Sequence, residues 1–426
     1  GIYLDSDSNL NTSGTNTVNI TGKKNTIFYV NTEGTFNQNF LINGNNNADY
    51  TLMYINSNKG TYNGSAVLSG NSTVFYGVNS VIELGTSSSL TAPGGNTAGI
   101  YADGLYGGIT DYEGINKGEM LFGDDSAGLY GINGARLLNT GNITTGSKSL
   151  GMSSEASDYL RNKGTIKTGS NSIGMSAKNT ALTENSGNII AAGENITALY
   201  SENSGISVIN NTGNIELTGK NTIGVYLEEG GQQTFNNNKV IKTENSENSS
   251  IASTGIYNNG HIVNNTGDII AGMSTAGIYN DNGIIRHSGS ITSEADGVGI
   301  YSAGGEINLT DGTIISKGFA IYAENNTKIM NTGTEVNTGD KTVAYVLKSG
   351  SGLINNQNAS IGTGSIYVYG NGTGEIVNNA SSIIMTGPES MGYYLTNSES
   401  LINNADITGL ANGNMGIYSD KGSVVN

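Results

Sequence analysis

The sequence contains no cysteine or tryptophan, two prolines, two histidines and few charged residues. Without cysteine the chain can form no disulfide, no thiolate metal site and no cysteine nucleophile. Two histidines cannot build a multi-histidine metal centre. Charged residues make up 13% of the chain, about half the usual share, and the formal net charge of −16 opposes binding to nucleic-acid phosphates. This composition excludes several classes of metalloprotein, thiol enzyme and nucleic-acid-binding protein.

Long apolar runs are also absent, so no segment of about 18 apolar residues could cross a membrane as a helix. We find no basic segment followed by an apolar one that would form a signal peptide. Glycine is abundant instead, with 64 residues, and asparagine is nearly as common. Such a composition can indicate disorder. The apolar residues, however, recur at a fixed spacing, which favours a folded repeat.

The strongest pattern is an internal repeat of about 24 residues. One motif consists of a small or apolar residue, glycine or alanine, an apolar residue and often tyrosine. Clear copies are Ala98-Gly99-Ile100-Tyr101, Ala127-Gly128-Leu129-Tyr130, Thr254-Gly255-Ile256-Tyr257, Ala276-Gly277-Ile278-Tyr279 and Met415-Gly416-Ile417-Tyr418. A second motif follows about a dozen residues later, as in Leu138-Asn139-Thr140-Gly141-Asn142-Ile143. Repeats of this length must stack on one another to bury a continuous apolar core.

The period within each motif is two, and isoleucine, valine, threonine and tyrosine dominate, which is typical of strands. Each repeat is predicted to form three short strands joined by turns. A leucine-rich repeat fold has a similar repeat length, but the sequence lacks its leucine framework. The blades of a propeller are longer than these repeats. We therefore predict an all-β, single-stranded parallel β-helix, three-sided and right-handed, with about 18 coils of about 24 residues. Residues 1–426 would form one continuous segment of a longer protein, since both ends fall within a repeat.

The tight corners of such coils require residues that tolerate positive φ, which glycine and asparagine supply. Asparagines stacked in successive coils can also form an amide ladder. The candidates for this ladder are Asn139, Asn162, Asn185, Asn211, Asn265, Asn331, Asn379 and Asn404. His287 occupies the equivalent position of its own repeat.

The Gly-Ile-Tyr and Asn-Thr-Gly-Asn-Ile motifs resemble those of passenger domains of Gram-negative type V autotransporters. The Asn-, Ile- and Tyr-rich composition is most similar to the large outer-membrane adhesins of fusobacteria. This resemblance covers essentially the whole chain. It implies secretion to the cell surface, a C-terminal β-barrel translocator beyond Asn426, and adhesion. The implied partners are host-cell surface glycoproteins or glycans, immune-cell receptors among them, and the surfaces of partner bacteria, without nucleic acid.

Two coils are longer than the rest, and we expect loop excursions at residues 102–126 and 227–253. Departures from a regular surface are where binding is expected. Aromatic rings can stack on sugars or anchor an interface, and carboxylates can bind hydroxyls or basic groups. The candidate receptor-binding residues on these excursions are Tyr106, Asp111, Tyr112, Glu113, Glu228, Glu229 and Phe235. A surface insertion without a ligand is the alternative interpretation of each excursion.

Tyrosines of successive motifs are predicted to form an outward stripe. If Ile100 points inward, alternation places Gly99 and Tyr101 outward. The stripe would include Tyr257, Tyr279, Tyr301 and Tyr322. It could be an aromatic binding strip or a lateral packing surface. It could also be purely structural, with stacked rings that support one another and shield the backbone beside the glycines.

A β-helix can also carry a polysaccharide lyase or hydrolase, which needs paired carboxylates on one face. The adjacent pairs Asp124-Asp125 and Glu228-Glu229 do not provide such a couple, and Arg286-His287 beside Asp281 is the best polar cluster around a histidine. We expect His261 and His287 to be structural. The main hypothesis is a non-enzymatic, cell-surface adhesin passenger without cofactor or metal. A β-helical glycan depolymerase and a rigid spacer remain the alternatives.

Overall fold

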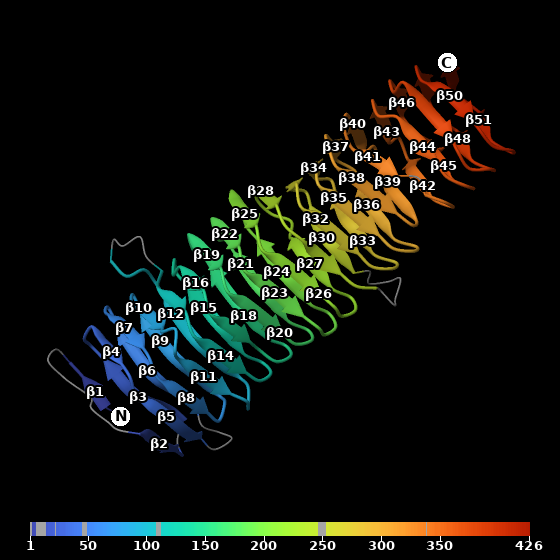
Figure 1. Cartoon of the computed structure of the whole chain (residues 1–426). Helices are drawn as coiled ribbons and strands as arrows, with labels where there is room; N and C mark the ends of the chain where they lie inside the picture. Colours follow the sequence, from blue (N-terminus) through green and yellow to red (C-terminus); the bar gives the residue numbers. More distant parts are fainter. Residues whose placement is uncertain are drawn as a thin grey trace. The chain divides into compact units, whose positions relative to one another are not determined.

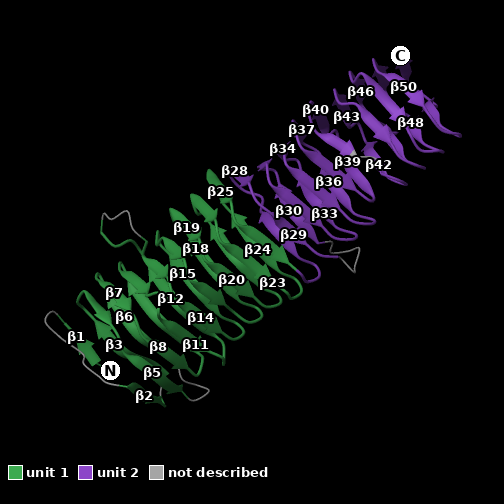
Figure 2. Ribbon diagram, in the orientation of Figure 1, with its two compact units in different colours: residues 1–217 green, residues 218–426 purple. Residues whose placement is uncertain are grey.

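The computed structural model describes residues 2–5, 14–21, 23–44, 49–107, 112–245, 253–337 and 339–426. All regular elements of these residues are strands, and every strand pairing is parallel between successive repeats (Figure 1). The chain divides into two compact units, Gly1–Leu217 and Thr218–Asn426 (Figure 2). Each unit is a parallel β-solenoid whose coils pass through three sheets, which we name A, C and B in chain order. The predicted fold class is confirmed, with about 17 coils in the chain.

Unit 1 contains the following strands. Those of sheet A are β1 (Ile2–Leu4), β3 (Lys23–Val30), β6 (Asp49–Asn56), β9 (Ser72–Val78), β12 (Thr97–Asp103), β15 (Ala127–Ile132), β18 (Leu150–Glu155), β21 (Ile173–Lys178) and β24 (Thr197–Glu202). Those of sheet C are β4 (Gly34–Phe36), β7 (Lys59–Tyr62), β10 (Val81–Leu84), β13 (Gly114–Asn116), β16 (Leu137–Asn139), β19 (Tyr159–Asn162), β22 (Leu182–Asn185) and β25 (Ser207–Asn211). Those of sheet B are β2 (Thr15–Ile20), β5 (Asn39–Gly44), β8 (Ser65–Leu68), β11 (Ser89–Ala92), β14 (Glu119–Phe122), β17 (Asn142–Thr144), β20 (Thr165–Thr168), β23 (Asn188–Ala191) and β26 (Asn214–Leu217).

Unit 2 repeats this order. Its sheet A strands are β27 (Ile223–Leu227), β30 (Thr254–Asn259), β33 (Ala276–Asp281), β36 (Val298–Ala303), β39 (Phe319–Glu324), β42 (Val343–Lys348), β45 (Ile366–Asn371), β48 (Met391–Thr396) and β51 (Met415–Ser419). Its sheet C strands are β28 (Gln233–Asn237), β31 (Ile262–Asn265), β34 (Ile284–His287), β37 (Glu306–Leu309), β40 (Lys328–Asn331), β43 (Gly352–Asn355), β46 (Glu375–Asn378), β49 (Ser400–Asn403) and β52 (Ser423–Val425). Its sheet B strands are β29 (Ile241–Thr243), β32 (Asp268–Ala271), β35 (Ser290–Ser293), β38 (Thr313–Ser316) and β41 (Glu335–Asn337), and β44 (Ala359–Ile361), β47 (Ser382–Met385) and β50 (Asp406–Gly409) form a separate three-stranded sheet.

The central apolar residues of the glycine-containing motifs line up inside each unit. In unit 2, Ile256 pairs with Ile278, which pairs with Ile300 and then Ile321, and all four are fully buried. In unit 1, Ile100 pairs with Leu129 in the same way. These apolar files form the core. The described residues include no helix with the length and apolar character needed to cross a membrane.

The glycine of each motif faces the interior, contrary to the prediction that Gly99 points outward. The register between β12 and β15 passes from Ala98 to Ile100 without pairing Gly99, so the alternation of faces is interrupted there. A Cβ atom added to Gly99 would lie 2.5 Å from the carbonyl oxygen of Gly128 in the next coil. Glycine thus allows successive coils to approach closely, while Tyr101 still points outward and is half-buried.

Many corners between sheets contain residues with positive φ, as predicted. Asn71, Asn96 and Asn171 have φ between 49° and 56° and lie one or two residues before strands of sheet A. Asparagine tolerates this left-handed conformation better than most residues do. This preference explains part of the high asparagine content.

A second set of asparagines forms the predicted amide ladder at the ends of the sheet C strands. In unit 1, the side-chain Nδ2 atom of each member donates to the Oδ1 atom of the next over 2.7–2.8 Å, and all are buried. The members of this set are Asn116, Asn139, Asn162, Asn185 and Asn211. In unit 2 the ladder has two parts. The first consists of Asn237, Asn265 and His287. Leu309 occupies the next position, and the second part consists of Asn331, Asn355, Asn378 and Asn403.

The assignment of Asn379 and Asn404 to this ladder is wrong by one residue. Their predecessors Asn378 and Asn403 occupy the buried positions. Asn379 and Asn404 are exposed and bond to one another on the outside. Since adjacent residues of a strand face opposite sides, a shift of one residue exchanges inside and outside.

Candidate functional site

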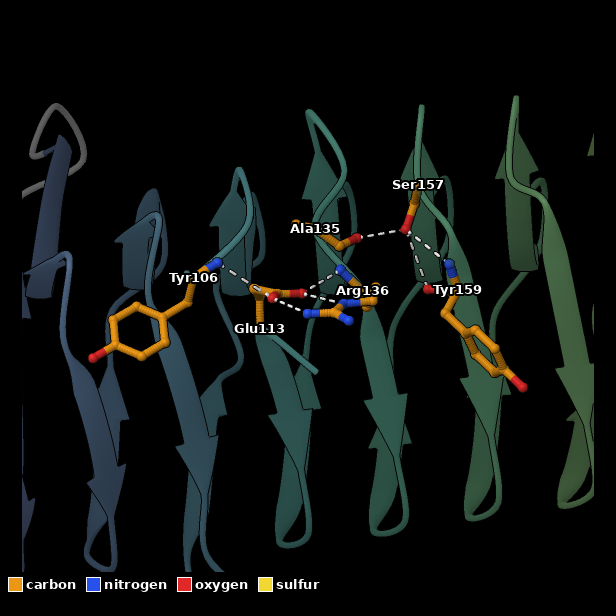
Figure 3. A network of polar contacts seen from close by, with 6 residues as sticks. All are labelled: Tyr106, Glu113, Ala135, Arg136, Ser157 and Tyr159. Atoms are coloured by element: carbon orange, nitrogen blue, oxygen red, sulfur yellow. Dashed lines mark hydrogen bonds and ion pairs between the residues drawn. The ribbon is translucent and has the colours of Figure 1, made fainter. Parts of the chain in front are cut away.

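The excursion between β12 and β13 in unit 1 carries most of the predicted site residues. Its described parts are residues 104–107 and 112–113; Asp111 lies outside the described residues. The predicted excursion at 102–126 was too long, because residues from Gly114 onward return to the solenoid as β13 and β14. Figure 3 shows Tyr106 and Glu113, one from each described part of the excursion, joined by a hydrogen bond beside Arg136.

Glu113 anchors this excursion and is not a surface residue. Its carboxylate is 1% exposed and accepts hydrogen bonds from Arg136 Nη2 at 2.7 Å, Arg136 Nε at 3.1 Å and the Arg136 backbone N–H at 2.8 Å. The Tyr106 backbone N–H also donates to it over 3.3 Å (Figure 3). Glu113 thus joins both ends of the excursion to the next coil. The prediction that Glu113 contacts a receptor directly is wrong, because the side chain is buried and no ligand can reach it.

Tyr106 lies on the opposite end of the excursion and reaches back along sheet C. Its hydroxyl donates to the Glu33 carboxylate over 3.2 Å, three coils earlier in the chain. Lys59 lies over its ring, with Nζ 5.6 Å from the ring centroid. Tyr106 is half-buried, so part of the ring remains available to a partner.

Tyr112 points the other way and forms one wall of a shallow pocket. Its ring packs edge-on against Tyr159 at a centroid distance of 5.9 Å. Burial raises the pKa of Tyr112 and nearby Arg161 opposes that rise, so the phenol stays protonated at neutral pH. The pocket has a volume of about 380 Å³, and the polar residues that line it with Tyr112 are Lys59, Thr61, Glu83 and Lys117. Lys117 and Glu83 form an ion pair of 2.8 Å.

An aromatic wall beside paired charges can hold a small group of either polar or apolar character. Ile115 and Leu138 provide the apolar floor of this pocket. Sugars and side chains of protein partners both offer the combination of a flat apolar face and hydrogen-bonding groups. The excursion therefore forms a compact candidate recognition surface, which we define as Tyr106, Tyr112, Lys59, Glu83 and Lys117.

The second predicted excursion, in unit 2, is mostly regular solenoid. The range 227–253 contains β28 and β29, and residues 246–252 lie outside the described residues. Glu228 and Glu229 form the turn after β27, where Glu229 is exposed. Gln233 Nε2 donates to the Glu228 carbonyl oxygen over 2.9 Å. Partial burial and then the Glu228 carboxylate raise the pKa of Tyr226 to about 12.

Phe235 is a further correction to the predicted site. It lies in β28, pairs with Val263 of β31 and is fully buried. It is a core residue and cannot contact a receptor. The length of its coil suggested a loop, but the extra residues lie elsewhere in that coil.

Unit 1 has a second surface feature that the sequence prediction missed. An open groove of about 870 Å³ runs beside sheet A, with the rings of Tyr101 and Tyr130 along it. Its charged lining residues are Lys23, Asp49, Asp125 and Lys148. Asp125 and Lys148 have positive φ, of 56° and 55°. They occupy the same corner position in successive coils, and this recurrence is the signal that could have revealed the groove.

The outward tyrosines form the predicted stripe. In unit 2, the ring centroids of Tyr257, Tyr279, Tyr301 and Tyr322 are 4.9, 4.9 and 5.1 Å apart in sequence order, with nearly parallel planes. Each ring face is therefore covered by its neighbours. Lys348 Nζ lies 5.0 Å from the centroid of the Tyr322 ring.

The predicted polar cluster around His287 does not form a surface site. His287 points into the amide ladder and is fully buried, while the adjacent Arg286 is exposed on the outer side. Nδ1 of His287 lies 3.1 Å from Asn265 Nδ2. The described residues contain no group of three or more histidine, aspartate or glutamate side chains arranged to hold a metal ion.

No family model, curated protein or solved structure matches this chain in the comparisons.

Proposed function

We propose that this chain is the passenger segment of a non-catalytic, surface-displayed adhesin of the type V autotransporter kind, similar to those of fusobacteria. The β-solenoid fold and the Gly-Ile-Tyr and Asn-Thr-Gly-Asn-Ile repeats support this proposal. A chain without cysteine can also cross an oxidising periplasm without forming disulfides. Its location would be the outer surface of a bacterial cell.

The observation that carries the proposal is the anchored excursion of unit 1. A buried ion pair, Glu113 with Arg136, holds the segment on the outer face of sheet C. Burying a carboxylate costs free energy unless it is fully paired, and a tolerated surface insertion would have no need of such an anchor. The anchor keeps Tyr106 and Tyr112 half-buried beside Lys59, which favours a preorganised recognition surface.

The proposed partners are glycoproteins or glycans of a host-cell surface, immune-cell receptors included, or the surface of a partner bacterium. The pocket at Tyr112 supplies a ring for stacking and charged groups for hydrogen bonds. A single contact of this size is weak, so many displayed copies would act together between two cells.

The test is a cell-binding assay with beads that carry the whole chain. We expect the double variant Tyr106→Ser, Tyr112→Ser to lose at least about five-fold of its bound host or bacterial cells. The control is Tyr200→Ser, an outward half-buried tyrosine of β24 in the same unit. Both variants should unfold cooperatively, as measured by circular dichroism.

The outcomes separate the alternatives. If the double variant binds as well as the unmodified chain, the excursion is not the recognition surface. If the unmodified chain binds no cells, the spacer interpretation is favoured. Release of reducing sugar from host or bacterial polysaccharides by the unmodified chain would contradict the non-catalytic proposal and favour a depolymerase.

A further inference from the structure

The outer face of sheet C in unit 2 carries an apolar stripe, defined as Met330, Ile354, Val377 and Ile402. The strand register places these four residues directly beside one another on β40, β43, β46 and β49. Met330 is 46% exposed and Ile354 is 40% exposed. Neighbouring strands are about 4.8 Å apart, so the stripe is continuous over four coils.

The charged residues beside this stripe are Lys328, Glu375 and Glu306, which is exposed on β37 and pairs with Lys328. Lys328 and Glu375 are exposed. They lie two residues before Met330 and Val377 on their strands, hence on the same outer face. Gly352 occupies the same position on β43, between them, and pairs with Lys328. Two strand steps, about 10 Å, separate Lys328 from Glu375, and among the described residues neither of them forms an ion pair.

We propose that this face binds a second copy of the same chain, antiparallel and face to face, around a two-fold axis at β43. The axis runs parallel to the strands. Each residue therefore faces a residue at the same position along a strand of the second copy, and the coils of the second copy follow in the reverse order. Lys328 then faces Glu375 of the second copy, and the reciprocal pair forms as well. Ile354 faces its own equivalent, and Met330 faces Val377.

The dimensions of the two faces fit this arrangement. Packed sheets lie about 10 Å apart, a gap that an extended lysine and a glutamate can bridge together. Gly352 has no side chain, so the two backbones can approach at the axis. The repeat along the stripe is identical in both copies, because both are built from the same strand spacing. Every coil of one copy therefore meets a coil of the other.

The charges also select the register. A two-fold axis at β40 would place Lys328 against itself, and an axis at β46 would place Glu375 against itself, so both arrangements are penalised by like charges. A half-step shift, with the axis between β43 and β46, pairs Ile354 with Val377 and Met330 with Ile402. In that register Lys328 remains within one strand step of Glu375 of the second copy. Both favourable registers rely on the same two charges.

The contact should be weak in solution. Five strands by four residues cover about 300 Å² of each copy, well below the roughly 800 Å² per partner of a stable interface. The high net negative charge of −16 opposes association further. Many copies on two facing surfaces would be needed for firm attachment. This self-contact does not depend on the recognition surface of unit 1.

The decisive experiment uses charge reversal at both positions of the whole chain. We expect Lys328→Glu and Glu375→Lys each to weaken self-association at least about ten-fold. Mixing the two single variants should restore association. One variant then presents two glutamates at these two positions and the other presents two lysines, so every facing pair has opposite charges. The double variant Lys328→Glu, Glu375→Lys should associate with itself as the unmodified chain does.

Sedimentation velocity over a concentration series measures the association, and clustering of beads coated with the chain measures its multivalent form. Lys163→Glu and Glu335→Lys are the controls, because they make equal charge changes at exposed residues outside this face and should leave clustering unchanged. The proposal is overturned if the unmodified chain neither associates nor clusters. It is also overturned if the mixture and the double variant remain as weak as the single variants.

Discussion

At the residue scale, the buried amide ladder carries polar groups through an otherwise apolar interior. Each asparagine both donates and accepts, so neighbouring members satisfy one another. A buried polar group that lacks a partner costs about 1–3 kcal/mol, and the ladder avoids that cost in the coils that contribute an asparagine. One replacement is tolerated at His287, whose ring can accept from Asn265 and donate to the Thr313 carbonyl oxygen.

His287 should make the stability of the protein depend on pH. Burial lowers its pKa from 6.5 to about 4, and the backbone hydrogen bond to Thr313 only partly opposes this. The unfolded chain therefore binds the extra proton between pH 6.5 and 4, so stability is full above about pH 6.5 and falls as the pH drops. The loss at pH 4 is roughly 3 kcal/mol.

The variant His287→Asn tests this, because it restores an amide to the ladder and removes the titrating group. The unfolding free energy, measured in urea, should decrease between pH 7 and pH 4 in both proteins. We expect the decrease to be roughly 3 kcal/mol smaller in the variant than in the unmodified chain. Equal losses in the two proteins would show that His287 does not carry this dependence.

Glu113 is the residue on which the geometry of the excursion depends. We expect Glu113→Gln to destabilise unit 1 by about 3 kcal/mol, since Arg136 would lose its buried partner. Limited proteolysis should then cleave within residues 104–113 faster, and thermal unfolding measures the stability.

The matched control is Glu184→Gln, which removes the partner of Arg161 from a pair whose side chains are about one quarter exposed. It should cost less than about 1 kcal/mol. If both variants are destabilised by the same amount, burial of the Glu113 pair does not anchor the excursion.

At the element scale, the strands of sheet A contain a break in alternation at each motif glycine. Two successive residues, Gly277 and Ile278, are both buried. A Cβ atom at Gly277 would lie 2.5 Å from the Gly299 carbonyl oxygen and 2.7 Å from Cγ2 of Ile291. Alanine occupies this position at Ala320, so a small side chain can be accommodated with local adjustment.

This predicts a graded response to substitution at Gly277. Valine should destabilise the protein by about 3 kcal/mol and alanine by about 1 kcal/mol, because the closest contact is with rigid backbone of the next coil. Urea unfolding followed by far-ultraviolet circular dichroism measures both. A valine variant as stable as the alanine variant would mean that the coils are not in such close contact.

The same scale explains what the sequence could and could not predict. The fully buried apolar file was predictable because its residues repeat with the coil length. Gly99 was misassigned because strict alternation was assumed where the strand has an unpaired residue. Asn379 and Asn404 were misassigned because each follows another asparagine, and the pattern alone cannot say which of two equal neighbours faces inward. Phe235 was assigned to a loop from the coil length, although it aligns with Val263.

At the scale of the whole molecule, both units use one construction, with apolar files inside, amides at one corner and tyrosines outside. Regularity was therefore predictable from the sequence, and the candidate site only in part. Tyr106 and Tyr112 were identified as departures from the repeat, but the groove of Tyr101 and Tyr130 was not. It is assembled from residues of several coils that are unremarkable within any single repeat.

The proposed function depends most on partner contact at Tyr106, and site-specific photo-crosslinking measures that contact directly. A photoreactive benzoylphenylalanine at position 106 of the whole chain, irradiated on host or bacterial cells, should yield a covalent adduct with a surface component. The same residue at position 200 should yield none. Adducts of equal yield at both positions, or an adduct at position 200 alone, would contradict the proposed recognition surface.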